Sequence, residues 1–437
     1  MREMKDSGIE WIGEIPKGWK VPKIKYVAKF LNGDRGKNYP SGNDLTDSGI
    51  VFLTSNNIRG VVLDCTSDIT KYITEKRYNI LGGAKIRKND IIFCLRGSVG
   101  NCAINKTENE GTIASSLVDI RPIKVVAGFL NYCLKSDINS IQTSINMNGS
   151  CAANLSAENV ANYCFIEPSI SEQQQIANFL DTQCSEIDAT AEDIQKEISL
   201  LEEYKKSVIT EAVTKGLNPD AEMKDSGIEW IGEIPKDWVT IRIGNIFSLR
   251  NERNYLPMEQ VQLLSLYSGK GVFPTGEEGT TNSGNHAQTV ADYKIVKRND
   301  IVVNIILAWM GSLGISNYDG VVSPAYDVYI PDEEKVVPHY YHYVFRTSGI
   351  ANECYRYGRG IMMMRWRTYS SEFKRIHVPF PSFDEQQQIA DYLDSKCSEI
   401  DTLIADKKRQ LDILADYKKS IIYEYVTGKK EVLVKDF

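Results

Sequence analysis

The sequence has few of the features that mark membrane or disulfide-bonded proteins. It holds nine cysteines without a Cys-x-x-Cys pair, and no long apolar run. About 18 consecutive apolar residues are needed to span a membrane, so we expect no membrane segment. The N-terminal residues also lack the apolar stretch of a signal peptide. An odd number of cysteines without Cys-x-x-Cys spacing is typical of free thiols in a reducing compartment. This predicts a cytoplasmic protein.

Motifs for three kinds of catalytic or metal chemistry are absent as well. None of the three Gly-Lys pairs is followed by the serine or threonine of a nucleotide-binding loop. The Asn-Pro-Pro-aromatic loop of amino-methyltransferases is missing, because Asn218–Pro219 is followed by Asp220. The four histidines form no HExxH motif, and the cysteines have no zinc-binding spacing. We therefore predict a protein that is not an enzyme and that holds no metal.

The sequence does contain an internal repeat. Residues 4–19 (MKDSGIEWIGEIPKGW) recur at 223–238 with one change, from Gly18 to Asp237. EQQQIA and CSEID, which begin at Glu172 and Cys184, both recur later in the chain, at Glu385 and Cys397. The chain is therefore predicted to be two copies of one unit laid head to tail. Such a pseudo-dimer suits a ligand that has two sites in a line.

Each copy is predicted to end in a long helix. Apolar residues recur at steps of three and four from Ile176 to Val208 and again from Ile389 to Tyr425, which is the heptad pattern. We predict that the first helix spans about 171–213 and that Ser171 with Gln174, and Asp384 with Gln387, cap the two helices. The two helices would pair antiparallel as a coiled coil; the alternative is that each packs on its own globular part. The residues predicted to pack between the helices are Ile187, Ile194, Ile198, Leu201, Ile400, Ile404, Leu411 and Leu414, and Lys407 interrupts the second stripe.

The segments before the helices are predicted to be globular domains of mixed structure. Alternating or continuous apolar runs predict strands at 91–95 and 117–121 in the first copy, and at 301–307 and 326–330 in the second. A helix is expected after each pair, at 126–134 and 340–345. The expected fold class is therefore α+β, with two globular domains in pseudo-two-fold tandem repeat and two long antiparallel helices. The predicted boundaries are 1–167 and 217–380 for the domains, and 168–216 and 381–430 for the helices.

Loops of the first copy offer polar side chains for binding nucleic acid. The segment Arg96-Gly-Ser-Val-Gly-Asn101 follows a strand, and its glycines would let backbone N–H groups approach a phosphate. The alternative is a plain hairpin turn. Arginine and asparagine are also the side chains that read base edges. The candidates in this copy are Arg96, Ser98, Asn101, Asn56, Asn57, Arg59, Asn148 and Ser150.

The second copy offers a more basic surface. Residues 346–375 hold seven basic residues against two acidic ones, with tyrosines and a tryptophan between them. Cations for phosphate and planar rings for bases are what a nucleic-acid surface needs. The alternative is a solvated charged face, or ordinary surface turns. The candidates in this copy are Ser265, Lys270, Trp309, Ser312, Arg359, Arg365 and Arg367.

Four motifs together suggest a family. They are SGIEWIGEIP (from Ser7 and Ser226), NDIIFCLRGSVGNCAI (from Asn89), NLS (from Asn154) and EQQQIANFLD with EQQQIADYLD. With these motifs in order, the chain resembles the specificity subunit of type I restriction–modification enzymes over essentially its whole length. The resemblance implies two target-recognition domains, each reading one half of a split, asymmetric site in double-stranded DNA. It also implies that the two helices act as the spacer that fixes the gap.

The resemblance further implies the partners. Two methyltransferase subunits would bind the chain and modify adenine with S-adenosylmethionine, and restriction subunits that use ATP and Mg would cleave unmodified DNA. The chain itself would bind no cofactor. Because recognition domains differ widely within the family, the motifs assign no base contact to a residue. The alternative function is a coiled-coil scaffold that binds protein partners.

Overall fold

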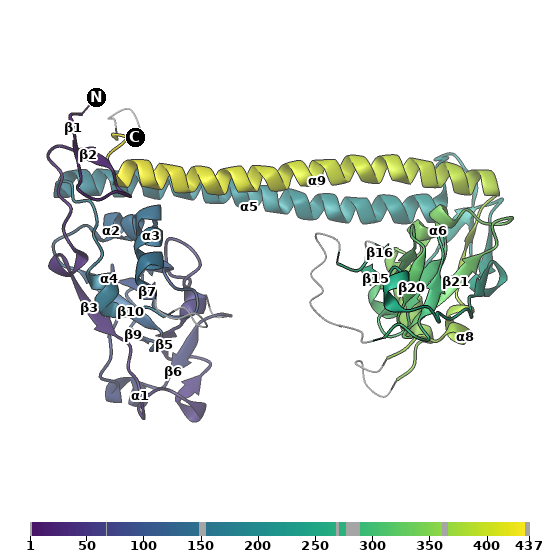
Figure 1. Cartoon of the computed structure of the whole chain (residues 1–437), viewed down its shortest axis with the longest axis horizontal. Helices are drawn as coiled ribbons and strands as arrows, with labels where there is room; N and C mark the ends of the chain where they lie inside the picture. Colours follow the sequence, from purple (N-terminus) through teal and green to yellow (C-terminus); the bar gives the residue numbers. More distant parts are fainter. Residues whose placement is uncertain are drawn as a thin grey trace. The chain divides into compact units, whose positions relative to one another are not determined.

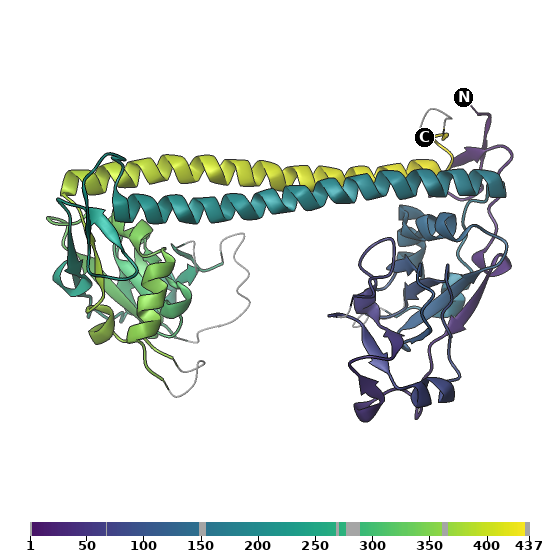
Figure 2. The same ribbon diagram turned by 180° about the vertical axis from the view of Figure 1, so that it is seen from behind.

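The computed structural model describes residues 2–66, 68–147, 154–267, 271–276, 289–360 and 366–432. The chain forms two compact units (Figures 1 and 2). Unit 1 comprises Met1–Ile194 with Arg409–Phe437, and unit 2 comprises Gln195–Lys408. Each unit thus contains one globular part and segments of both long helices. The predictions for Asn148, Ser150, Lys270 and Arg365 fall outside the described residues.

The globular part of unit 1 is built on two four-stranded sheets. The first has the order β3-β10-β7-β8 and is antiparallel throughout. The second has the order β4-β6-β5-β9, in which β5 and β9 run parallel. The strands of the first sheet are β3 (Ala28–Asn32), β10 (Leu117–Pro122), β7 (Ile91–Cys94) and β8 (Cys102–Ile104). Those of the second are β4 (Leu45–Thr46), β6 (Lys71–Ile73), β5 (Ile50–Leu53) and β9 (Gly111–Ile113).

The central strand β7 shows why the sequence Ile-Ile-Phe-Cys is continuously apolar. Successive side chains of a strand point to opposite faces. Ile91 and Phe93 belong to the core shared with the helices, whereas Ile92 and Cys94 belong to the core shared with the second sheet. The helices of this part are α1 (Glu75–Ile80), α2 (Ala127–Lys135), α3 (Asp137–Asn146) and α4 (Ala157–Ala161). In Figure 1, α2 and α3 lie between the sheets and the long helix α5.

Unit 2 repeats the first of these sheets with the same strand order, β14-β21-β18-β19. Its central strand β18 again separates two cores, because Ile301 and Val303 face one and Val302 faces the other. The four strands are β14 (Phe247–Leu249), β21 (Tyr326–Pro331), β18 (Ile301–Asn304) and β19 (Leu313–Ile315). Three two-stranded sheets pair β13 (Val239–Arg242) with β22 (His377–Phe380), β15 (Leu264–Tyr267) with β16 (Gly271–Pro274), and β17 (Lys294–Val296) with β20 (Gly320–Val322). The helices are α6 (Pro338–Val344), α7 (Ser348–Tyr357) and α8 (Ser370–Phe373).

The repeated 16-residue motif forms a small hairpin in each unit. Strands β1 (Met4–Asp6) and β2 (Glu14–Pro16) pair in the same register as β11 (Met223–Asp225) and β12 (Glu233–Pro235). Each hairpin packs at the C-terminal end of a long helix. Gly428, after α9, lies so close to Pro16 that a Cβ there would be 2.5 Å from its ring, and Gly216, after α5, lies against Trp238. Both glycines have a positive φ of 73–75°, a conformation that favours glycine as the residue that ends a helix.

The two long helices are α5 (Ile170–Lys215) and α9 (Phe383–Val426). Ser169 and Ser382 cap them, rather than the predicted Ser171 and Asp384. In each case the serine N–H donates to the glutamate three residues on, whose own N–H donates to the serine Oγ. The prediction of the caps was wrong by two residues because the periodic apolar stripe begins six residues after the helix does.

In both units α5 and α9 run antiparallel. In unit 1, Phe179 packs on Tyr425 with ring centroids 4.4 Å apart, and Asp188 accepts a hydrogen bond from Lys418 at 2.5 Å. In unit 2, Glu197 pairs with Lys407 at 2.5 Å, and Lys205 pairs with Asp401 at 2.6 Å. In both units, the residue numbers rise along α5 while those of the contacting residues of α9 fall.

Of the eight residues predicted to pack between the helices, five are buried and three are half-buried. The buried ones are Ile187, Ile194, Ile198, Ile400 and Ile404, and the half-buried ones are Leu201, Leu411 and Leu414. The two packing alternatives also coexist, since Ile176, Ala177 and Leu180 of α5 belong to the same core as Phe129 and Leu130 of α2. Lys407, which interrupts the stripe, is matched by the carboxylate of Glu197.

No helix among the described residues is long and apolar enough to cross a membrane. The eight cysteines in the described part of the chain are free thiols.

Candidate nucleic-acid interface

In the first repeat, a hairpin loop presents three of the predicted residues. Arg96, Ser98 and Asn101 are exposed between β7 and β8. Gly97 and Gly100 have φ values of 76° and 90°, which glycine adopts without strain. The loop is thus a tight hairpin turn, which was the alternative to a binding loop. It also displays three polar side chains together.

The hairpin loop is held in place by two neighbouring segments. Asn139 of α3 donates to the carbonyl oxygen of Gly100 at 3.3 Å. The Arg96 Nε donates to Asn154 Oδ1 at 3.1 Å, and the backbones of these two residues form a bridge. Because its Nε is oriented by Asn154, the guanidinium of Arg96 keeps its Nη donors for a ligand.

The second predicted loop of this repeat follows β5. Asn56 and Arg59 are exposed, and the Arg59 Nε donates to the Asn56 carbonyl oxygen at 3.1 Å. Asn57 was predicted to bind DNA, but it is completely buried. Its Oδ1 accepts from Thr54, and its Nδ2 donates to Asp64 and Thr70. We correct its role to holding this loop together, since every polar atom of its side chain is used inside the protein.

In the second repeat, the strand predicted for residues 301–307 ends at Asn304. Asn304 Oδ1 accepts from the backbone N–H groups of Ile306 and Leu307, and a 3₁₀ turn, Ala308–Met310, follows. The apolar run in the sequence is therefore longer than the strand. Its later residues Leu307 and Met310 lie in the turn, where they are exposed. Ser312 was predicted to bind DNA but is 2% exposed, so we correct it to a buried position in the turn.

The basic stretch of this repeat, residues 346–375, brings arginines and aromatic rings together near the turn Ala308–Met310. Arg359 and Arg367 are exposed, and their backbones pair with each other. Arg359 also forms an ion pair with Glu372 and lies over the Tyr369 ring. Trp309 lies half-buried with its ring 6.0 Å from that of Tyr355. Tyr355 and Trp366 lie in the stretch that was predicted to be a nucleic-acid surface, because it mixes basic and aromatic residues, but neither was among the individual candidates.

Ser265 lies in the hairpin of β15 and β16. Its Oγ is 2.8 Å from the Oγ1 of Thr275, and the residue is half-buried.

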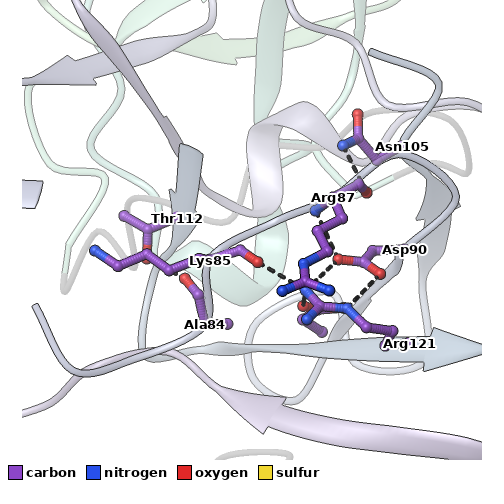
Figure 3. Close-up of polar contacts among 8 residues, drawn as sticks. Ala84, Lys85, Arg87, Asp90, Asn105, Thr112 and Arg121 are labelled. Atoms are coloured by element: carbon purple, nitrogen blue, oxygen red, sulfur yellow. Dashed lines mark hydrogen bonds and ion pairs between the residues drawn. The ribbon is translucent and has the colours of Figure 1, made fainter. Parts of the chain in front are cut away.

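A buried ion pair fixes the turn that leads into the central strand of each repeat. Asp90 accepts from Nε and Nη2 of Arg121 at 2.9 and 2.7 Å, and from the backbone N–H of Arg87 at 2.7 Å (Figure 3). In the second repeat Asp300 binds Arg250 in the same two-pronged way, at 2.7 and 2.9 Å. The hydrogen bonds to these carboxylates raise the pKa of both arginines. Both arginines therefore stabilise the domain from inside.

Asp119 lies beside this pair in the first repeat and is completely buried. Its Oδ2 accepts from Arg121 at 3.1 Å, while its Oδ1 has no hydrogen-bond partner among the described residues. Burial, and then the neighbouring charge of Asp90, raise the pKa of Asp119 to about 8.

Among the described residues, no group of three or more histidine, cysteine, aspartate or glutamate side chains is placed to hold a metal. The exposed polar and aromatic groups of the two turns can bind a ligand through hydrogen bonds, charge and stacking.

Comparison with known proteins identifies the family. Residues 16–200 and 235–412 match the type I restriction modification DNA specificity domain, one match in each repeat. The chain belongs to this family. It is a specificity subunit, the non-catalytic component of a type I restriction–modification system, as the resemblance in its motifs predicted.

Relatives and solved structures agree with this assignment. The putative type I restriction enzyme MjaX specificity subunit of Methanocaldococcus jannaschii is 25% identical over 96% of both chains. The EcoKI specificity subunit of Escherichia coli K12 is 24% identical over 46% of this chain and 44% of its own. A chain from a structure of a type I restriction–modification system has a TM-score of 0.69 at 14% identity, covering 95% of this specificity subunit and 99% of its own length. The HsdS subunit of Thermoanaerobacter tengcongensis has a TM-score of 0.51 at 14% identity, covering 95% and 98%. At this identity the two structures support the fold alone.

Proposed function

We propose that each repeat reads one half of a bipartite, asymmetric site in double-stranded DNA. The observation that carries this proposal is the pair of matching turns. Each turn follows the central strand of the same four-stranded frame, yet the first displays Arg96, Ser98 and Asn101, and the second displays Trp309 and Met310. Two different half-sites require domains that share one fold and expose different side chains.

The charge distribution supports the globular parts, and not the helices, as the DNA-binding surface. The helices α5 and α9 together carry 20 acidic and 10 basic residues. From totals of 58 and 51, the rest of the chain carries 38 acidic and 41 basic residues. Since phosphate contacts supply most of the affinity for DNA, a chain with net charge −7 should bind DNA weakly until a partner completes the basic surface.

We further propose that the chain positions two methyltransferase subunits for adenine methylation, and restriction subunits for cleavage of unmodified DNA, in the cytoplasm. S-adenosylmethionine, ATP and Mg would be bound by those partners. The relatives are named as specificity subunits of restriction enzymes, which supports this assignment of partners.

Sequencing of modified adenines in host DNA tests the function directly. Deleting the gene should remove one bipartite methylation motif, and restoring the wild-type gene should return it. An unchanged set of methylated motifs would contradict the proposal and favour a protein-binding scaffold. In the same way, purified chain alone should retain little site-specific DNA, and adding the methyltransferase subunit should restore retention. Tight specific binding by the single chain would contradict the charge argument.

Lengthening the helices tests their role as a spacer. One heptad inserted into α5 after Ala191 and one into α9 after Leu414 would keep both apolar stripes in phase near the Asp188–Lys418 ion pair. Seven residues add about 10 Å of helix, which corresponds to about three base pairs of DNA. We expect a longer gap between unchanged half-sites. Changed half-sites with a fixed gap would refute the spacer role.

A further inference from the structure

The second repeat carries an exposed aromatic patch, which we define as Trp309, Met310, Tyr355 and Trp366. The Tyr355 and Trp366 rings stack with centroids 5.2 Å apart and planes 24° apart. Trp309 continues the row at 6.0 Å from Tyr355. Tyr355 is 46% exposed and Met310 is 59% exposed. The rings therefore form a supported platform that reaches the solvent.

Hydrogen bonds inside the protein occupy the N–H donors of both indole rings. The Trp309 Nε1 donates to the Ile306 carbonyl oxygen, and the Trp366 Nε1 donates to the Tyr355 carbonyl oxygen, each at 3.0 Å. Gly358 permits the second of these contacts, since a Cβ there would lie 2.4 Å from the Trp366 Nε1. The tryptophans thus offer apolar surface, and no indole N–H remains for a ligand.

Exposed arginines lie next to the aromatic patch, since Arg356 follows Tyr355 and Arg367 follows Trp366 in the chain. The side chains of Arg356 and Arg359 are 66% and 65% exposed, and Arg367 is also exposed. Arg356 contacts Glu353, and Arg359 contacts Glu372, but a guanidinium has five N–H donors, so each keeps donors for a further partner. An apolar centre within a cationic rim is complementary to a polyanion that presents an apolar group.

The equivalent place in the first repeat has the opposite character. Ser144, the eighth residue of α3, stands where Tyr355, the eighth residue of α7, stands in the second repeat. Both residues are exposed. The aromatic patch is therefore specific to one of the two repeats.

We infer that the aromatic patch reads thymine through its 5-methyl group in the half-site of the second repeat. In the major groove, every base-pair edge presents hydrogen-bond donors and acceptors, and the thymine methyl is the one apolar group among the four common bases. A surface without free indole donors distinguishes bases there by covering that methyl, while the arginine rim binds the flanking phosphates. This inference rests on the proposed function and names the base chemistry that one repeat recognises.

Deoxyuridine provides the test, because it lacks only the 5-methyl group of thymidine. Once the methylation motif is known, duplexes are made with deoxyuridine replacing every thymidine of one half-site or of the other. Affinity is measured with the wild-type chain in complex with its methyltransferase subunits. We expect binding to weaken about fourfold per thymine in one half-site only, from the free energy of burying one methyl-sized group.

Variants assign the effect to the aromatic patch. Trp366→Ala and Tyr355→Ser, the second taken from Ser144 of the first repeat, should bind thymidine and deoxyuridine duplexes equally. Tyr26→Ser is the matched control, because Tyr26 is 65% exposed in the first repeat, and it should leave the discrimination intact. If a variant fails to fold, the measurement with wild-type protein still decides.

The outcomes separate this inference from the proposed function. Absence of any bipartite motif refutes the proposed function. A motif with tight binding but no deoxyuridine effect in either half-site, or a second half-site without thymine, refutes the inference alone. Weaker methyltransferase association in Trp366→Ala, with unchanged deoxyuridine discrimination once the methyltransferase is supplied in excess, would also refute it, because the aromatic patch would then bind protein.

Discussion

Replacing one glutamine of the EQQQ motif should loosen the long helix from its globular part. Gln173 of α5 is completely buried. Its Oε1 accepts from the backbone N–H of Val126 at 2.9 Å, and its Nε2 donates to the Pro168 carbonyl oxygen at 3.0 Å. Methionine has a similar length and shape, so Gln173→Met removes both hydrogen bonds and leaves little cavity. The backbone N–H of Val126, just before α2, then loses its partner.

The two contacts set the expected magnitude. Each buried backbone group left without a partner costs about 1–3 kcal/mol, so the variant should lose about 3 kcal/mol of unfolding free energy. Urea unfolding of the parent and the variant measures the loss. Hydrogen exchange followed by mass spectrometry localises it, and residues 126–135 should exchange faster, since opening of α2 becomes easier.

Gln174, the next residue, is a matched control within the same motif. It is exposed, and among the described residues its side chain bonds only to Asn178 on its own helix, at 2.8 Å. Gln174→Met should therefore change stability by less than about 0.5 kcal/mol. Equal effects of the two substitutions would refute the reasoning. The second repeat offers a replicate, because Gln386 is buried and bonded to Val337, Lys335 and Pro381.

Three further predictions follow from the corrected and newly placed residues. Ser169→Ala should cost about 1 kcal/mol of stability through loss of the helix cap, whereas Ser171→Ala should not; the reverse order would restore the original assignment. Asp119 has its pKa raised from 3.8 to about 8, so the folded state favours its protonated form, and the stability that this form contributes at low pH is lost as pH rises from about 4 to 8. Urea unfolding at pH 5 and 8.5 should then show Asp119→Asn gaining about 2 kcal/mol or more on the parent at the higher pH, and a constant difference would contradict the shift. Arg96→Ala should weaken affinity for one half-site about tenfold, while Asn57→Ala should lower unfolding free energy by about 2 kcal/mol with the methylation motif unchanged; a changed motif in the second variant would return Asn57 to the interface.

Periodicity in the sequence was sufficient to locate the main elements. Heptad spacing from Ile176 to Val208 predicted α5, because a helix of that length must bury a continuous stripe. The predicted strands at 91–95, 117–121 and 326–330 match β7, β10 and β21 to within one residue at either end. These strands are recognisable because they are apolar on both faces or end at a proline.

Features that depend on tertiary contacts could not be read from the sequence. Asn304 looks like part of an apolar strand, but its side chain accepts from two backbone N–H groups and starts a turn. Asn57 looks like a polar loop residue, yet a neighbouring segment at Asp64 and Thr70 encloses it. A polar residue in a loop has the same appearance in sequence whether it faces water or satisfies the backbone. Exposure separates the two, and exposure is set by residues distant in the chain.

The side chains that are identical in the two repeats share a physical role. Glu172 and Glu385 cap the long helices, and Gln173 and Gln386 tie them to the start of α2 and α6. Two further matched contacts join these helices, from Tyr132 to Asp181 at 2.8 Å and from Tyr343 to Asp394 at 2.5 Å. The glutamate bonds close the ends of the long helices, and the others connect a long helix to a globular part. None of these bonds involves the turns that carry Arg96 or Trp309.

This separation between frame and turns makes exchange of the turns a demanding test of the fold. The residues that differ, Ser144 and Tyr355 among them, are exposed at equivalent helix positions, so moving an exposed residue between repeats should cost little stability. Ser144→Tyr should therefore fold like the parent and change only what the first repeat recognises. The reverse substitution made at a frame contact, Tyr132→Ser, removes a buried ring and should cost about 3 kcal/mol or more. Recognition can vary at the turns because the bonds that hold the frame lie elsewhere.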